Sequence, residues 1–282
     1  MSLFMSKALI SVVIPTKNSA KTLNMCLRSI KGQSYQNTEI IVVDGYSSDG
    51  TVEIAKKYRC KVLFEKSLLG ARAKGIEEAQ GEYILLLDSD QILMPTCMER
   101  AINMLERGYD ALILEESSYE AKTFIQKLYE IDRMLVHSTL DVHSLHGVLL
   151  ARFFKKSILE RTLNNIPLKL LSEVIVYDHA LINYEASKLT TRIGFLRDAI
   201  KHIEPKSFKQ VILKFYRWGK TARNLTDGPY EEILKRKTIP RKGILHPLKI
   251  HYSIASLLLW FLHAVPFAIG YLTTNKRKPR DY

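Results

Sequence analysis

The chain has 282 residues, of which 46% are hydrophobic and 25% are charged, and it carries a formal net charge of +13. This composition is ordinary for a globular protein and excludes a disordered chain or one embedded entirely in a membrane, and the length favours one domain with an appendage. Residues 201–282 hold 17 Lys and Arg residues against 5 Asp and Glu residues, so nucleic acid, anionic lipid and phosphorylated substrates are all candidate partners of this region.

Short apolar runs alternate with amphipathic segments at the start of the chain. Strands are predicted at residues 9–14, 39–43, 61–64 and 83–87, separated by helices after Ser19 and at residues 51–58 and 71–80. In the first of these helices, Leu23, Cys26, Leu27 and Ile30 recur at helical spacing. Strands that alternate with helices predict an α/β fold with a mostly parallel, twisted sheet covered on both faces.

The same alternation continues in the second part of the chain. It predicts a helix up to residue 107, a strand at 111–114, a helix at 121–136, an apolar segment at 147–150 and a helix that holds Asp178. A last helix is predicted at 205–225, because Pro205 is a favoured first-turn residue. Its apolar residues recur on one face, which we expect to dock on the domain: Phe208, Val211, Ile212 and Phe215.

Polar residues follow three of the predicted strands. Pro15 and Thr16, Asp44, and Asp88–Asp90 all lie at carboxyl ends, which is where open α/β sheets bind ligands. The alternative is that each aspartate caps the next helix. Asp88 and Asp90 supply the hard oxygen ligands that Mn²⁺ or Mg²⁺ needs to hold a substrate diphosphate.

Three segments between residues 10 and 90 carry a resemblance to a known family: ISVVIPTKNSAKTLNMCLRSI, EIIVVDGYSSDGT and LLGARAKGIEEAQGEYILLLDSD. They resemble the donor-binding half of the family 2 glycosyltransferases with the GT-A fold. The resemblance implies a GT-A domain over residues 1–225, with a nucleotide-sugar-binding half at 1–115 and an acceptor half at 116–225. It also implies inverting transfer from a nucleoside-diphosphate sugar, assisted by Mn²⁺ or Mg²⁺.

The resemblance assigns donor-site roles residue by residue. Pro15 and Thr16 would line the nucleotide pocket, Asp44 would accept a hydrogen bond from the base, and Ser47 and Asp49 would lie in the adjoining loop. Asp88 and Ser89 would face the donor, and Arg72 would lie beside the nucleotide, the alternative for Arg72 being a surface ion pair. Family members often have two acidic residues after the second strand, whereas this chain has Asp44-Gly45.

The acceptor half matches more loosely. Gly147 resembles the small residue that lets the backbone approach the sugar, and Asp178 aligns with the general base, although Tyr177-Asp178 stands in place of the usual Glu-Asp pair. The alternative for Asp178 is a helix-terminal ion pair. His202 resembles a histidine that reaches the metal or the diphosphate, its alternative being a structural hydrogen bond.

Basic residues at helical spacing follow His202. Arg217 and Lys220, together with Lys214 and Arg223, are candidates for holding the donor diphosphate or an acceptor phosphate. The alternative is a stripe that faces solvent or lipid.

The C-terminal residues 226–282 read as a basic linker followed by an apolar, membrane-associated segment at 254–272. This segment is long enough to cross a bilayer, but His263 and Pro266 also allow a kinked helix in one leaflet, and a buried soluble helix is a third possibility. The basic cluster at 235–242 favours a membrane. We therefore expect a lipid-linked saccharide or polyprenyl phosphate as acceptor, or another saccharide, and attachment to the cytoplasmic face of the cell membrane.

The cysteines and the N-terminus agree with a cytosolic active site. Cys26, Cys60 and Cys97 lie far apart, which predicts neither a disulfide framework nor a zinc site. The N-terminal residues lack a long apolar stretch with a cleavage-like site, so we predict no secretory signal.

Two competing hypotheses remain at this level. The pI of about 9.5 and the aromatic and basic run at 215–223 also suit a nucleic-acid-binding protein. Carboxylates at the strand ends would repel a phosphate backbone, so we expect no nucleic-acid partner. A catalytically inactive relative of the family is the other alternative.

Overall fold

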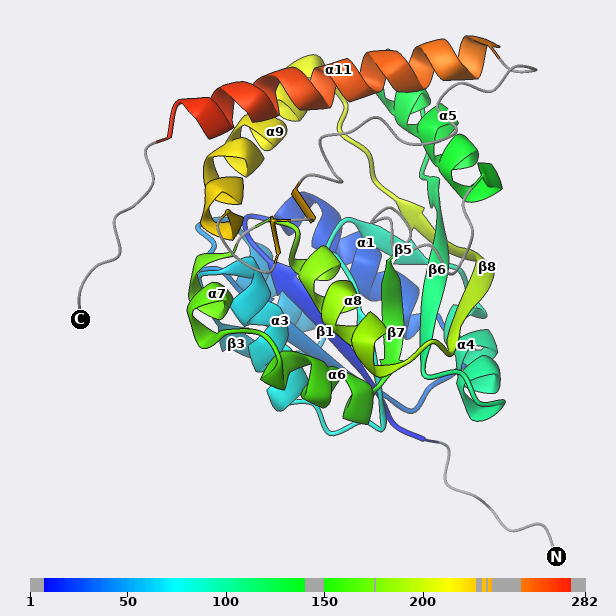
Figure 1. Ribbon diagram of the computed structural model, residues 1–282. Helices are drawn as coiled ribbons and strands as arrows, with labels where there is room; N and C mark the ends of the chain where they lie inside the picture. The colour runs from blue at the N-terminus through cyan, green and yellow to red at the C-terminus, as the bar shows by residue number, and fades with distance from the viewer. Residues whose placement is uncertain are drawn as a thin grey trace, which may run out of the picture.

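The computed structural model describes residues 8–139, 150–174, 176–226, 230–231, 233–234 and 250–274. These residues build one mixed eight-stranded sheet in the order β3-β2-β1-β4-β7-β6-β8-β5, with helices on both faces. Two long helices, α9 (Phe208–Ala222) and α11 (Ile250–Leu272), lie across the end of the molecule that is remote from the N-terminus (Figure 1).

The first half of the sheet is parallel, as predicted. Its strands are β1 (Ile10–Thr16), β2 (Thr38–Asp44), β3 (Lys61–Phe64) and β4 (Tyr83–Leu86), and its helices are α1 (Ala20–Lys31), α2 (Thr51–Lys57) and α3 (Leu68–Glu77). Every residue of β1 is buried, because neighbours pair with both of its edges and helices cover both of its faces. Thr16 pairs with Asp44 in register, so β1 and β2 end at the same level.

The second half of the sheet contains the antiparallel pairs. It consists of β5 (Gln91–Leu93), β6 (Ala111–Ser118), β7 (Ala151–Lys155) and β8 (Ile193–His202), in which β7 runs antiparallel to β4 and β6, and β5 antiparallel to β8. None of β5, β7 and β8 was predicted as a strand, and the apolar segment predicted at 147–150 ends just before β7. The first has three residues, and the β6–β8 register shifts between Leu114 and Glu116, so the alternation of buried and exposed residues is broken.

The remaining helices cover the two faces and the site end. They are α4 (Cys97–Glu106), α5 (Phe124–Thr139), α6 (Lys156–Asn164), α7 (Leu168–Glu173), α8 (Asp178–Leu189) and the short η1 (Arg223–Leu225). One core lies between the sheet, α1 and α4, and the other lies between the sheet, α3, α6 and α8.

The predicted start of α9 at Pro205 is wrong. The helix begins at Phe208, because the Ser207 side chain accepts a hydrogen bond from the backbone N–H of Gln210 and so caps the first turn. The predicted docking face is only partly correct. Val211 is buried, but Phe208 and Ile212 are exposed.

The apolar C-terminal segment forms α11, and the window Tyr252–Leu272 is long and apolar enough to cross a membrane. In the structure this helix packs along α9. A Cβ atom on Gly219 would lie 2.0 Å from the Phe267 carbonyl oxygen, and one on Gly270 would lie 2.1 Å from that of Tyr216. Glycine therefore allows the two backbones to touch. The domain boundary between residues 225 and 226 stays a prediction.

Candidate functional site

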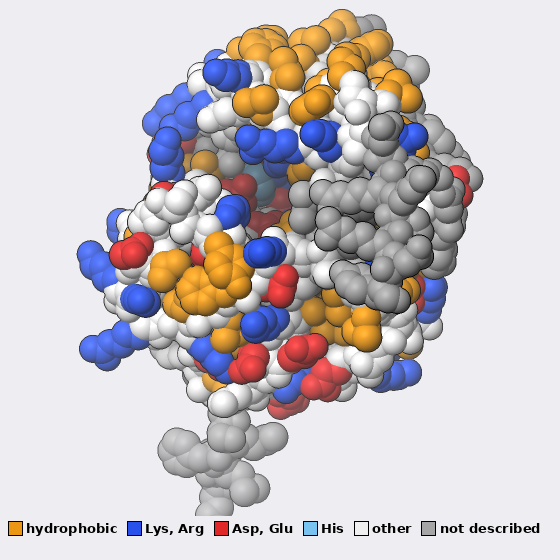
Figure 2. Space-filling model, turned by 90° about the vertical axis from the view of Figure 1, so that its left-hand side faces the viewer, with side chains coloured by type: hydrophobic (Ala, Val, Ile, Leu, Met, Phe, Trp, Pro, Cys, Tyr) orange, Lys and Arg blue, Asp and Glu red, His pale blue; other side chains and the backbone are white. Residues whose placement is uncertain are grey.

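A hollow lies beneath the apolar end of the molecule (Figure 2). Acidic and histidine side chains are visible at its floor, and Lys and Arg side chains stand at its rim. The carboxyl ends of β1, β2 and β4 contribute the polar clusters that the sequence predicts at the strand ends.

The clusters that follow β1 and β2 are in direct contact. The Thr16 hydroxyl donates to Asp44 Oδ2 at 2.8 Å, and Asp44 also accepts from the Ser47 backbone N–H at 2.7 Å and from its hydroxyl at 2.6 Å. Asp44 is completely buried, so its carboxylate fixes the loop at residues 45–47. Its contact with a base stays a prediction, as do the pocket-lining roles of Thr16 and of Pro15, which is buried in β1.

Asp49 lies in the same loop and ties two helices together. Its carboxylate accepts from the Ala20 backbone N–H at 3.1 Å and from the Thr51 N–H at 3.1 Å, which are the first residues of α1 and α2. A hydrogen bond from the Thr51 hydroxyl holds the pKa of Asp49 below its ordinary value. The third cluster contacts the start of α1 through Ser89, whose hydroxyl lies 2.9 Å from that of Ser19.

Arg72 lies between the two most important predicted carboxylates. Its guanidinium is 1% exposed and donates through Nε to Asp178 and through Nη2 to Asp88. The alternative of a surface ion pair is therefore wrong, because the Arg72 side chain, which α3 carries, is buried. Burial alone would raise the pKa of Asp178, but Arg72 outweighs it and keeps this pKa below the ordinary value. Asp178, the first residue of α8, is thus held ionised.

Arg152 of β7 extends the contacts of Arg72 with Asp88 and Asp178. It was not predicted as a site residue from the sequence. Its Nη1 donates to Asp88 Oδ2 at 3.0 Å and its Nε donates to Glu116 Oε1 at 2.7 Å. The same Nη1 lies 2.7 Å from His179 Nε2. Burial and the two arginines lower the pKa of His179, which favours a neutral imidazole that accepts from Arg152.

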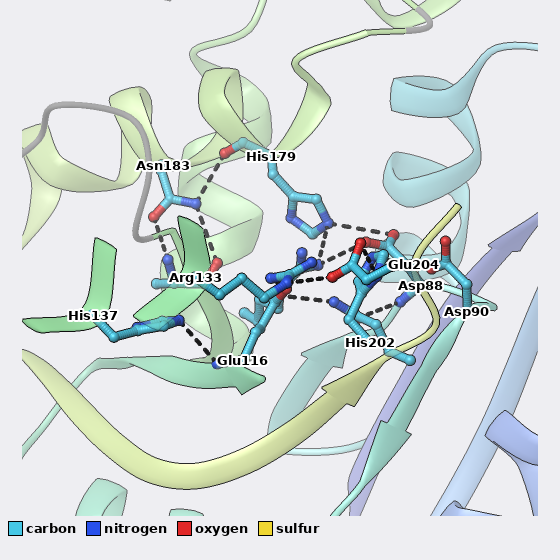
Figure 3. A network of polar contacts seen from close by, with 12 residues as sticks. Asp88, Asp90, Glu116, Arg133, His137, His179, Asn183, His202 and Glu204 are labelled. Carbon is cyan, nitrogen blue, oxygen red and sulfur yellow. Dashed lines mark hydrogen bonds and ion pairs between the residues drawn. The ribbon is translucent and has the colours of Figure 1, made fainter. Parts of the chain in front are cut away.

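Arg133 of α5 continues the network to the far side of the site (Figure 3). It donates to Glu116 Oε2 at 2.6 Å and to Glu204 Oε1 at 2.5 Å. Glu204 Oε2 lies 3.3 Å from His202 Nδ1, and His202 Nε2 lies 3.6 Å from Asp90 Oδ1. Acidic and basic side chains therefore alternate without a break from Asp178 to Asp90.

A signal for the missed residues was present. Arg152 interrupts an apolar run, Glu116 is the second of two acidic residues that follow another, and Glu204 directly precedes a proline. A charge within an apolar strand is rarely left without a partner, so it indicates a buried ion pair. The partner itself is set by the antiparallel pairing of β7 with β4 and β6, which the sequence does not reveal.

The predicted metal ligands meet only in part. In the described ranges no three His, Cys, Asp or Glu side chains are arranged to hold a metal ion. Asp90 and His202 are adjacent, whereas Asp88 turns toward Arg72 and Arg152. A carboxylate has about four acceptor positions, so an Asp88 oxygen can bind an arginine and a metal together. The carboxylate oxygens at the end of the strand suit Mn²⁺ or Mg²⁺.

The surroundings of His202 favour its protonated form, with which such an ion would compete. Burial opposes the charged form, but Asp90 and Glu204 outweigh it and raise the pKa of His202 above its ordinary value. Metal binding requires the neutral imidazole, so the ion and the proton compete for this side chain.

The predicted acceptor residues are divided. Gly147 lies outside the described residues. Arg217 and Lys220 are exposed on α9, and their phosphate contacts stay predictions. Lys214 lies 5.0 Å above the Trp218 ring, which in turn contacts Tyr177 beside Asp178. Arg223 instead donates to the backbone oxygens of Tyr271 and Thr274 and caps the end of α11.

Arg133→Met is expected to destabilise the protein by about 3–5 kcal/mol near neutral pH, because it leaves Glu116 and Glu204 buried without their partner. Burial alone would raise the pKa of Glu204, but His202 and Arg133 lower it to about 2. A carboxylate whose pKa is lowered on folding stabilises the fold at pH values above its ordinary pKa, which is 4.5 for Glu204. This contribution is lost as the pH falls toward 2.

The difference in the free energy of unfolding between the wild type and Arg133→Met should therefore be largest at pH 7–8 and become smaller below about pH 4.5. Urea denaturation at several pH values measures this difference, with Arg161→Met on the exposed face of α6 as the control. An equal loss at pH 4 and pH 8 would contradict an ionic origin.

Comparison with known proteins gives a consistent result. The model described as Glycosyl transferase family 2 matches residues 11–177. An uncharacterised glycosyltransferase of Haemophilus influenzae is 35% identical over 123 residues, which cover 41% of this chain and 48% of that protein. For this and two further curated relatives, the matched region spans only 28–48% of their length.

Two further similarities extend over most of the chain. The GalNAc(5)-diNAcBac-PP-undecaprenol beta-1,3-glucosyltransferase of Campylobacter jejuni is 23% identical, and the alignment covers 91% of this chain and 94% of that protein. A mannosyltransferase from Pyrobaculum calidifontis, solved in complex with GDP-Man and Mn²⁺, has a TM-score of 0.54 at 17% identity, covering 94% of this chain and 76% of the other. At that identity the structural likeness shows the fold alone, and it confirms the predicted GT-A architecture.

Proposed function

The chain belongs to glycosyl transferase family 2, and we propose that it is an inverting enzyme that transfers a sugar from a nucleoside-diphosphate sugar to a membrane-associated acceptor. The observation that carries this proposal is the continuous charge network, which joins Asp178 to Asp88 and Asp90 at the end of the sheet where α/β folds bind ligands. Donor binding, leaving-group departure and proton removal would then take place within one site.

The residues divide the reaction between them. The loop held by Asp44 would seat the nucleotide, and Asp88, Asp90 and His202 would hold Mn²⁺ or Mg²⁺. The bound ion would offset the negative charge that develops on the leaving diphosphate. Asp178 would accept the proton of the attacking hydroxyl, as an inverting transfer requires one carboxylate beside the acceptor.

Arg72 would position Asp178 for this role. It donates to the Asp178 carboxylate from a fully buried place, so the side chain cannot swing away from the site. The same contact lowers the basicity of Asp178, because it stabilises the ionised form. A weak base is enough for an acceptor that is already ionised, such as a polyprenyl phosphate, and with that acceptor Asp178 would act by positioning, whereas with a sugar hydroxyl it would take the proton.

A lipid-linked acceptor is supported by the surroundings of the site. The hollow lies beneath the apolar end of the molecule, and exposed basic side chains of α9 stand near it (Figure 2). The Campylobacter relative is named for an undecaprenol-linked substrate. We place the enzyme at the cytoplasmic face of the cell membrane, in agreement with a nucleotide-sugar donor.

Isothermal titration against a panel of nucleotide sugars with Mn²⁺ tests the donor assignment. Binding of at least one donor, followed by its slow hydrolysis, is the expected result and excludes an inactive relative. Failure of every donor, together with salt-dependent binding of oligonucleotides, would overturn the proposal.

Asp44→Ala is expected to raise KM for the donor by about tenfold or more, since hydrogen bonds to a charged group contribute about 1.5–3 kcal/mol. Turnover should change less, because a contact in the nucleotide pocket acts equally in the ground state and the transition state. Steady-state kinetics measures both constants, and Ser48→Ala in the same exposed loop is the control. A large fall in kcat at unchanged KM would contradict this role.

A further inference from the structure

The outward face of α11 is an unbroken apolar stripe. Six large side chains at intervals of three or four residues are 39–74% exposed along it: Ile254, Leu258, Phe261, Val265, Ile269 and Leu272. The opposite face of the same helix is buried at Ala255, Leu259 and Phe267. A helix that is apolar on both its protein face and its outer face is not explained by packing against the residues that the structure describes.

The inner face of α11 is held by the protein over its whole length. Near the start, the Ser256 hydroxyl donates to Asp132 Oδ1 at 3.0 Å. In the middle, His263 Nε2 lies 2.9 Å from the Tyr129 hydroxyl and its ring stacks on Phe215. Towards the end, the backbones of α9 and α11 touch at Gly219 and Gly270, as described above.

These contacts are incompatible with a helix that crosses a bilayer. A spanning helix would expose its whole circumference to lipid over about 30 Å and would have to leave both α5 and α9. His263 and Ser256 would then lie in hydrocarbon without the partners that satisfy them here, at a cost of several kcal/mol in an apolar medium.

The charges beside the stripe match an anionic surface. Neither α9 nor α11 contains an acidic residue, and α9 exposes Lys209, Arg217 and Lys220. The apolar surface continues onto α9 at Phe208 and Ile212, which are exposed. Apolar and basic side chains thus share one end of the molecule (Figure 2).

We propose that α11 lies in the plane of an anionic membrane, with its outward stripe at the boundary between headgroups and acyl chains and the basic side chains of α9 on the headgroups. The protein is then attached to one leaflet and does not span it. This deepens the proposed function, because the hollow beneath α11 would open at the membrane surface, but the docking itself depends only on the two helices.

Spin labels on the stripe test the orientation in the full-length protein. Ile254→Cys, Phe261→Cys and Ile269→Cys are each labelled in a Cys60→Ser background, since the other native cysteines are buried. The labels at 254 and 269 are about 22 Å apart along the helix axis. On vesicles that contain phosphatidylglycerol, power saturation should find all three at one shallow depth. A depth profile with the label at 261 near the bilayer centre would overturn the proposal and indicate a spanning helix.

Phe261→Asp combined with Val265→Asp should weaken binding to these vesicles by at least about tenfold. Each change removes one exposed apolar side chain and adds a negative charge, which the anionic lipid repels. Leu168→Asp on α7, which is 83% exposed, is the matched control and should bind like the wild type. Binding should also fall with added salt and on vesicles of phosphatidylcholine alone. Unchanged vesicle binding by the double variant would overturn the proposal. It would also be overturned if the wild type bound no vesicles and instead formed a dimer that the two substitutions disrupt.

Donor titration on the same samples separates this result from the proposed function. A protein that docks on vesicles but binds no nucleotide sugar contradicts the function and leaves the docking surface standing. A variant that binds the donor normally also shows that the substitutions have not unfolded the site.

Discussion

Asp90→Ala is expected to lower sugar transfer by about 10³-fold or more and to leave the fold intact. The Asp90 side chain is 36% exposed, and among the described residues its only recorded ionic neighbour is His202 at 3.6 Å. Its removal should therefore cost little stability. The loss of transfer follows from its proposed place as a ligand of the ion that stabilises the leaving diphosphate, where such electrostatic interactions are worth several kcal/mol.

Excess EDTA should have the same effect on the wild-type enzyme, and Mn²⁺ should restore activity to the wild type but not to the variant. Transfer of radiolabelled sugar measures both, with Glu53→Ala on the exposed side of α2 as the control. Full activity of the wild type in EDTA would disprove the metal assignment, and full activity of Asp90→Ala would disprove the role of this residue.

Asp178→Asn should retain donor binding and reduce transfer by about 10²–10⁴-fold if Asp178 is the general base. The amide keeps the shape of the carboxylate but cannot take the proton. Because Arg72 loses one of its two anionic partners, some stability is also lost. Asp110→Asn is a matched control, since Asp110 is a buried carboxylate that pairs with Lys155 and Arg192 outside the charge network.

The two variants should show similar losses in melting temperature, and only Asp178→Asn should lose turnover. Single-turnover assays with saturating donor separate chemistry from binding. Substantial residual transfer by Asp178→Asn would indicate that the acceptor is a phosphate already ionised near neutral pH. In that case Asp178 acts by positioning, in keeping with its lowered pKa.

The charge network also explains why the site can hold so many acids before the donor arrives. Asp88, Asp178, Glu116 and Glu204 are each paired with one or two guanidinium groups, so none is a lone buried charge. Removing one member leaves its neighbours uncompensated, and the cost spreads along the chain of contacts. The effects of substitutions within the network on the free energy of unfolding should therefore not be additive.

The donor half of this protein was largely predictable from local sequence patterns. The strands β1 to β4 and the buried face of α1 were predicted almost to the residue. Hydrophobic periodicity is local information, and parallel strands joined by helices end at one edge, so the placement of Thr16 and Asp44 at the same edge of the sheet followed from the pattern, whereas their hydrogen bond did not. The strand-end acids and the family resemblance then indicated the chemistry.

The pairing of the charges could not be predicted from the sequence, because it depends on contacts between distant segments. Arg72 and Asp178 are 106 positions apart in sequence, and Arg152 reaches Asp88 across the antiparallel pairing of β7 with β4. The sequence left α11 open between three arrangements, because an apolar helix has the same composition in a bilayer, in a core or on a surface. Which side of it is covered depends on α5 and α9, whose contacts with α11 are set by packing over long sequence separations and leave no periodic signal in the chain.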